Sequence, residues 1–310
     1  MKTLASVSLC ILVISCNSIP RDYKNVNSTL IKNLKSKRLN NRNLKGQIKS
    51  ITDYSYSLYP TNKEKKPSTK RKEMLRLFDR NGNIIEKTHF HQDSIITHRL
   101  FYSYNQNGQL IEYKRFNKSE LEQSRHYQYN EAQEHIESKN FNKNIGWRES
   151  KRTIFPEVNM IQWTELKKDI KFYYQRDYYN NINQLIAKVN QNGILRDSVC
   201  YRYNNKGLKT RIREFQFDGT LETETRITYD SHNNSISNLT FSNKGEFIKG
   251  TKYSHNDNND IIRISRFSGS NEVENEEYKY KYDYKHNWIY LESRTEDYRI
   301  KVTERKIEYY

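Results

Sequence analysis

Hydrophobic and polar residues alternate with a period of two along much of this chain. One run places Leu221, Thr223, Thr225, Ile227 and Tyr229 against Glu222, Glu224, Arg226 and Thr228. A second run places Tyr278, Tyr280, Tyr282 and Tyr284 against Lys279, Lys281 and Asp283. Successive side chains of a β-strand point to opposite faces, so the alternation predicts strands with one apolar face and one polar face.

A turn motif rich in Asn, Asp and Gly recurs between such runs about every 25 residues. An aromatic residue heads each of nine copies, at Phe78, Tyr104, Tyr129, Phe155, Tyr179, Tyr203, Tyr229, Tyr253 and Tyr282. Asn, Asp and Gly accept the positive φ of tight hairpin turns, and a second turn such as Asp218-Gly219 falls midway through most copies. We therefore predict an all-β fold: an elongated or curved antiparallel sheet of about nine two-strand hairpin repeats.

The motif resembles the YD repeat of the RHS family, whose copies begin Tyr-Asp-x-x-Gly-Asn. Leu44 to Thr52 also resembles the opening strand of uncharacterised bacterial lipoproteins with YD-like repeats, so the resemblance covers residues 44–310. It implies a curved antiparallel sheet and an association with carbohydrate binding. Long RHS proteins wind such repeats into a shell around a toxin domain, and nine copies are expected to be too few to close one.

The N-terminus has the features of an export signal. Lys2 precedes an apolar run, Leu4 to Ile14, that is too short to span a bilayer as a permanent helix. The run closes with Val13-Ile14-Ser15-Cys16, which resembles the bacterial lipobox. We predict a lipoprotein signal peptide at 1–15 and acylation of Cys16, which would tether the protein to the cell envelope, at the outer membrane, on either face. An ordinary signal peptide with a chance cysteine is the alternative.

The positive charge is concentrated near the N-terminus. The formal net charge is +17, and residues 21–76 contain sixteen Lys or Arg against four Asp or Glu. Residues 16–43 are expected to form a basic tether that attracts anionic lipid headgroups, or else a plain solvated linker. The remaining residues, 44–310, form the predicted repeat domain. Because export separates the protein from nucleic acid, we expect no nucleic-acid partner.

Composition and motif searches identify no catalytic machinery. Hydrophobic residues make up 34% of the chain and 25 residues are Tyr, which suits thin sheets more than a thick core. His89 and His91 suggest half of a metal site without a third ligand, so they are interpreted as structural, and no metal, cofactor or catalytic residue is assigned. Removal of Cys10 and acylation of Cys16 would leave Cys200 without a disulfide partner.

The strongest candidate ligand contacts lie near the C-terminus, where aromatic residues interleave with cations. They are Tyr278, Tyr280, Tyr282, Tyr284 and Trp288, a pattern used for stacking on sugars, although strand alternation alone also explains it. The last strand, with Ile300 and Val302 facing away from Lys301, is expected to leave an edge protected by charge.

The function expected from these features is that of a lipid-anchored envelope protein whose repeat sheet binds a glycan or an anionic envelope polymer, or serves as a scaffold. The alternatives are a polysaccharide-acting envelope enzyme and a component of an RHS-type contact-dependent toxin system.

Overall fold

The computed structural model describes residues 44–60, 65–91, 95–131, 135–155, 160–167, 170–180, 184–192, 195–295 and 300–310. The predicted signal peptide and basic tether lie outside these residues. Every described element is a strand, which confirms the all-β prediction. Nowhere in the described ranges is there a helix long and apolar enough to cross a bilayer.

The strands follow one another as β1 (Ile48–Pro60), β2 (Lys65–Pro67), β3 (Arg71–Phe78), β4 (Ile84–His91), β5 (Ile95–Tyr104), β6 (Leu110–Asn117), β7 (Glu120–Tyr129), β8 (His135–Asn142), β9 (Gly146–Phe155), β10 (Met160–Lys167), β11 (Ile170–Tyr179), β12 (Leu185–Asn192), β13 (Leu195–Tyr203), β14 (Lys209–Phe215), β15 (Leu221–Tyr229), β16 (Ser235–Ser242), β17 (Phe247–His255), β18 (Ile261–Ser268), β19 (Asn271–Tyr282), β20 (Trp288–Thr295) and β21 (Ile300–Tyr309).

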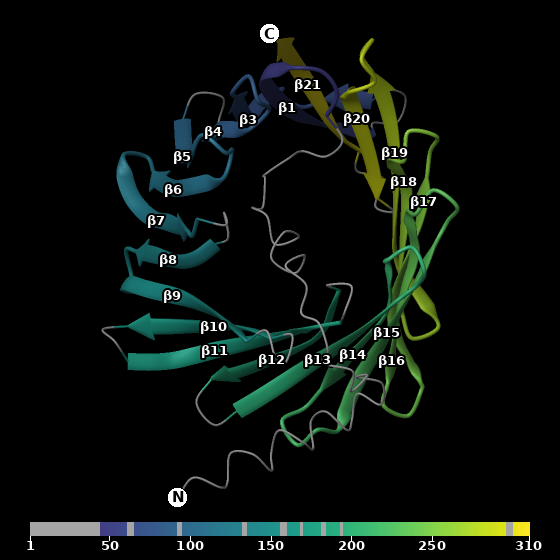
Figure 1. Cartoon of the computed structure of the whole chain (residues 1–310). Coiled ribbons are helices and arrows are strands. Elements are labelled where there is room, and N and C mark those ends of the chain that lie inside the picture. The colour runs from purple at the N-terminus through teal and green to yellow at the C-terminus, as the bar shows by residue number, and fades with distance from the viewer. Residues whose placement is uncertain are drawn as a thin grey trace, which may run out of the picture.

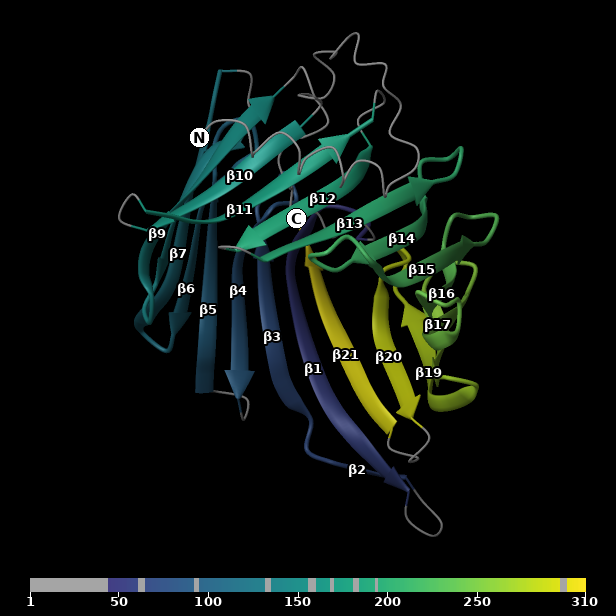
Figure 2. The same cartoon turned by 90° about the horizontal axis from the view of Figure 1, so that it is seen from below.

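The sheet closes on itself, which corrects the prediction of an elongated or curved sheet of hairpin repeats. From β3 to β21 each strand pairs antiparallel with the next, and β1 pairs with β3 on one side and with β21 on the other (Figure 1). Within the described ranges, β2 pairs only with the end of β1, so 20 of the 21 strands form a closed barrel (Figure 2). The strand that precedes the first repeat thus joins the two ends of the repeat array.

Closure also corrects the expectation of a charged edge at the C-terminus. Along β21, Val302 pairs with Tyr56 of β1 and with Glu292 of β20. Val302 is fully buried. Ile51 of β1, which lies on the opposite face of the sheet, is fully buried as well. A strand edge with unpaired N–H and C=O groups is a site for aggregation, and ring closure removes it.

The turns have the residue roles that the motif predicts. The first turn residue accepts two backbone N–H groups through its side chain, as Asp79 does from Asn81 at 2.9 Å and from Asn83 at 2.8 Å. The same cap recurs at Asn105, Asn204, Asp230, Asn256 and Asp283. Gly82 supplies the positive φ of 79°. These Asp and Asn side chains therefore reverse the chain.

The hydroxyl groups of the tyrosines that head the motif form hydrogen bonds, which explains why this position favours Tyr over Phe. Their hydroxyls donate to a backbone carbonyl at the start of the preceding repeat: Tyr104 to Ile84 at 2.9 Å and Tyr229 to Lys209 at 2.7 Å, for example. Burial raises the pKa of Tyr129, another such residue, to about 12, so the hydroxyl stays protonated and able to donate. Tyr129 and Tyr203 make the same kind of bond, so each of these four repeats is fastened to the one before it.

The structure shifts one head of the motif. The turn of that copy is closed by a hydrogen bond from Asn256 N to Asp260 O, so its head is His255. Tyr253, the predicted head, lies two residues earlier on the same face of β17. Aromatic identity alone selects the wrong residue here, because an imidazole fills the position.

Candidate functional site

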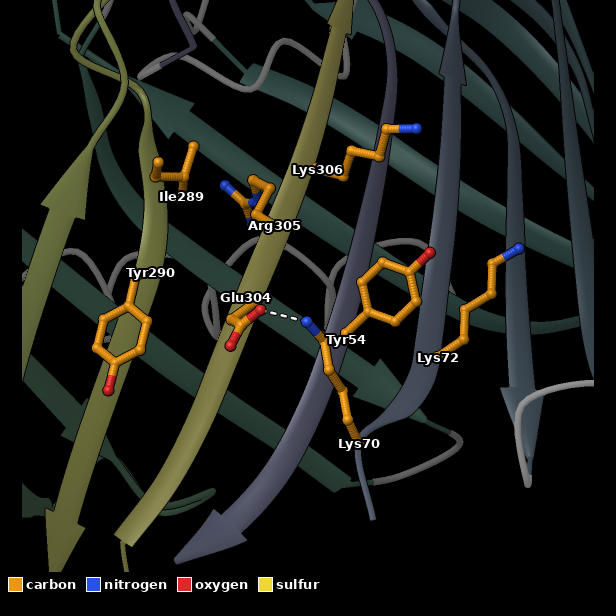
Figure 3. A pocket seen from close by; sticks show the side chains of 8 residues that line it. All are labelled: Tyr54, Lys70, Lys72, Ile289, Tyr290, Glu304, Arg305 and Lys306. Carbon is orange, nitrogen blue, oxygen red and sulfur yellow. Dashed lines mark hydrogen bonds and ion pairs between the residues drawn. The ribbon is translucent and has the colours of Figure 1, made fainter. Parts of the chain in front are cut away.

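A shallow pocket of about 880 Å³ lies on the outer face where the ring closes. Figure 3 views it from outside, because strands of the opposite wall lie behind it. Its lining residues come from β1, β3, β20, β21 and the segment before β3: Tyr54, Lys70, Lys72, Ile289, Tyr290, Glu304, Arg305 and Lys306. The only carboxylate among these eight residues is Glu304.

Glu304 is already engaged within the pocket. Lys70 forms an ion pair with it, and the Tyr56 hydroxyl donates to its other oxygen at 3.0 Å. The hydrogen bond to Lys70, the largest influence, holds the pKa of Glu304 below its usual range. A carboxylate held ionised by a lysine is a poor proton donor, so this pocket has no pair of carboxylates of the kind that glycoside hydrolysis requires.

The side chains that alternate with Tyr54 and Glu304 face the interior of the ring. Asp53 on β1 lies directly opposite Arg305 on β21, and directly opposite residues of an antiparallel pair share a face. Asp53 Oδ2 lies 2.6 Å from Arg76 Nη2 of β3, and its Oδ1 lies 2.8 Å from Arg305 Nε. One buried carboxylate thus joins the three strands that meet at the closure.

Four of the five predicted ligand contacts belong to the inner face. Tyr278, Tyr280 and Tyr282 alternate with exposed Lys279 and Lys281, as predicted. The rings of Tyr280 and Tyr282 stack with centroids 6.0 Å apart, and the hydroxyl of Tyr280 donates to the carbonyl of Ile261 at 2.9 Å. Their hydroxyls serve the framework, while their half-buried rings remain partly open to solvent.

Trp288, the fourth inner-face contact, and Tyr284, the fifth predicted contact, have different surroundings. Trp288 lies opposite Tyr282. The guanidinium of Arg305 stacks on its indole ring, with Arg305 Cζ 3.3 Å from the ring centroid. That cation covers one face of the indole. Tyr284 lies in the turn after β19 and is 78% exposed. The structure therefore does not bring Tyr284 together with the three inner tyrosines.

Sequence reasoning missed a set of cations on the inner face of β4 to β9: Lys87, Arg115, Arg125, Arg148 and Arg152, called here the basic inner wall. Strand register places them, because Lys87 lies opposite Arg76 and Leu100, and Leu100 lies opposite Arg115. A usable signal was present: a cation two residues from a tyrosine shares its face, as in Tyr113-Lys114-Arg115 and Arg125-His126-Tyr127.

From the sequence, His89 and His91 are interpreted as structural and Cys200 is expected to have no disulfide partner. His89 lies directly opposite His98 on the inner face, and burial, the largest cause, together with His98 and nearby cations, lowers the pKa of His89. Among the described residues there is no cluster of three or more potential metal ligands. Cys200 is disulfide-bonded, which corrects the expectation that it lacks a partner.

No family model matches this chain, and no curated protein matches its sequence. Among solved structures, a porin-like protein from Bacteroides uniformis is similar over 86% of this chain and 98% of its own, with 9% identity and a TM-score of 0.35. A TcdB2–TccC3 chain (8% identity, TM-score 0.27) and the Photorhabdus luminescens Tc holotoxin pore (10%, 0.30) are similar over 82% and 84% of this chain. This chain spans 19% and 18% of those two toxin chains. Similarities this low do not support an inference about function.

Proposed function

We propose that this protein is a lipid-anchored binding protein of the bacterial cell envelope that holds glycan on the aromatic inner face of its closed sheet. The observation that carries the proposal is the fixed orientation of two tyrosine rings on the inner face. Framework bonds occupy the hydroxyls of Tyr280 and Tyr282, so these two rings are held in fixed orientations. A fixed, partly open aromatic ring offers an apolar surface on which a sugar ring can pack at little cost in side-chain entropy.

The lining residues of the outer pocket include one carboxylate, Glu304, and so offer no pair of carboxylates for hydrolysis of a glycan at that pocket. The aromatic positions also repeat around the ring, because most repeats contribute a head tyrosine. Repetition suits a polymer, since several weak contacts along one chain add up to useful affinity.

Glycan binding is tested at Tyr280. We expect Tyr280→Ala to weaken binding of the mature protein to an envelope polysaccharide about tenfold, or about 1.4 kcal/mol, because it removes the stacking surface. Tyr280→Phe keeps the ring and loses only the bond to Ile261 that orients it, so it is expected to weaken binding less than Tyr280→Ala does. Isothermal titration on the two variants measures the difference, and equal affinities for Tyr280→Ala and the parent protein would contradict the proposal.

The anchor is tested at Cys16. We expect Cys16→Ala to move the protein from the membrane fraction to the soluble fraction and to abolish fatty-acid labelling, because acylation needs the Cys16 thiol. Lys2→Gln leaves the thiol in place and is the control. Unchanged membrane partition of Cys16→Ala would rule out the anchor.

The disulfide of Cys200 also concerns the predicted acylation of the Cys16 thiol. Of the other two cysteines, Cys10 belongs to the predicted signal peptide and Cys16 is the predicted acylation site. A thiol consumed by acylation cannot also form a disulfide, so mass spectrometry of the purified protein distinguishes a lipidated Cys16 from one bonded to Cys200.

A further inference from the structure

We infer that the basic inner wall of β4 to β9 is a binding site for an acidic polysaccharide, whose carboxylate or phosphate groups pair with its cations. The inference rests on the proposed function and names the class of glycan that this surface selects. The cations that form the site are Lys87, Arg115, Arg125, Arg148 and Arg152.

Two adjoining rows of paired residues bring these cations onto one surface. In the first row Lys87 lies opposite Leu100, and Leu100 lies opposite Arg115. In the second row Arg125 lies opposite Tyr113 on one side and Asn140 on the other, and Asn140 lies opposite Arg148. Residues directly opposite each other are close neighbours on one face, so the strands themselves hold the cations in sequence around the wall.

Among the described residues, carboxylates lie close to Arg115 and Arg148 of this wall. Glu122 lies 3.1 Å from Arg115, and Glu165 lies 3.8 Å from Arg148. The Nε atom of Arg125 is buried and has no hydrogen-bond partner among the described residues. Burial is the main cause that lowers the pKa of Lys87, and the neighbouring Arg76 lowers it further, as expected where positive charge is in excess.

Two cations on other parts of the inner face, Lys188 and Arg266, have carboxylate partners. Lys188 lies 3.8 Å from Asp177, and Arg266 lies 3.0 Å from Glu274 while also pairing with Glu276. At these two positions a carboxylate offsets the cation, whereas the buried Nε of Arg125 has no hydrogen-bond partner among the described residues.

The wall combines its charge with aromatic rings and remains accessible. Lys87 Nζ lies 5.9 Å from the centroid of Tyr102, and Arg152 Cζ lies 5.9 Å from that of Trp163. The Arg115 side chain is 41% exposed. Guanidinium groups bind carboxylate and phosphate oxygens through two parallel hydrogen bonds, while neighbouring rings pack on sugar.

The extent of the wall favours a polymer over a single sugar. From β4 to β9 there are five strand spacings, on the order of 24 Å at the usual separation of neighbouring strands. Cations distributed over such a length match a chain that carries an acidic group on successive units. The matching ligand is therefore a polyuronate or a phosphate-bearing polysaccharide.

The test measures binding of the whole mature protein to polygalacturonate, with dextran of similar length as the neutral probe. The double variant Arg115→Gln/Arg125→Gln is expected to bind polygalacturonate at least tenfold more weakly. Lys279→Gln/Lys281→Gln removes the same charge from exposed positions on the outer face and is expected to change the affinity less than twofold. Arg115→Lys/Arg125→Lys keeps the charge and is expected to bind, which separates loss of charge from loss of folding.

Equal weakening by the inner and outer double variants would overturn the site, because it would show binding by overall charge alone. Binding of dextran without binding of polygalacturonate would overturn the acidic specificity and leave glycan binding standing. Binding of neither probe would remove the inference and the proposed function together.

Discussion

Replacing Asp53 with alanine is expected to lower the free energy of unfolding by about 3–5 kcal/mol. The carboxylate of Asp53 contacts Arg76 and Arg305, and all three side chains are largely buried. Its removal leaves two guanidinium groups in the interior without their counter-charge, and desolvated charge is costly. Because the three residues belong to β1, β3 and β21, the loss falls on the strands that close the ring.

Urea unfolding of Asp53→Ala and of the nearly isosteric Asp53→Asn measures this effect. Glu120→Gln is the matched control, since Glu120 at the start of β7 forms an exposed ion pair with Lys143 at 2.6 Å, worth about 0–1 kcal/mol. Hydrogen exchange is expected to accelerate first in β1 and β21. A loss no larger than that of Glu120→Gln would refute the role of Asp53 in closure.

Asn287→Ala is expected to cost about 2–3 kcal/mol of stability, because one buried amide connects both ends of the described chain. Asn287 is 2% exposed. Its Oδ1 accepts from Lys45 N at 2.7 Å, and its Nδ2 donates to Lys45 O at 2.7 Å and to the Tyr309 hydroxyl at 2.8 Å. Alanine leaves these groups without their partners.

Asn234→Ala is the control for Asn287→Ala. Asn234 has the same place in an ordinary turn of the motif, where it bonds to Asp230 and Asn259 and remains accessible. We expect its loss to cost about 1 kcal/mol. Thermal unfolding compares the two variants, and equal shifts in Tm would mean that Asn287 acts only as a turn residue.

The strand alternation was predictable in most places and failed where charges cluster. Along β15 the alternation holds for Leu221 to Tyr229, yet Glu224, expected on the polar face, is only 6% exposed. Arg213 and Arg226 bond to it at 2.7 and 2.9 Å. Arg213 belongs to β14 and Glu224 and Arg226 to β15, so their meeting depends on the register of the two strands. A period-two pattern reports the face of a residue and says nothing of its neighbours across the strands.

In the candidate site, too, some residues were predictable from the sequence and others were not. Tyr278, Tyr280 and Tyr282 are recognisable from their spacing, because one strand carries all three. The basic inner wall is not, since its cations come from β4, β6, β7 and β9 and converge only when those strands pair. The contact of Arg305 with the ring of Trp288 likewise joins two strands, so the local sequence pattern could not predict it.

The sequence by itself determined the all-β class, the positions of most turns and the face on which each strand places its tyrosines. These features follow from local chemistry: side chains alternate along a strand, and Asn, Asp and Gly accept the backbone of a tight turn. Only the tertiary structure decided that the sheet closes, because closure depends on β1 meeting β21 across almost the whole described chain. The pattern of the nine repeats does not show that the first and last of them meet. The strand before them, β1, joins the two ends of the array, where Asp53 lies between Arg76 and Arg305.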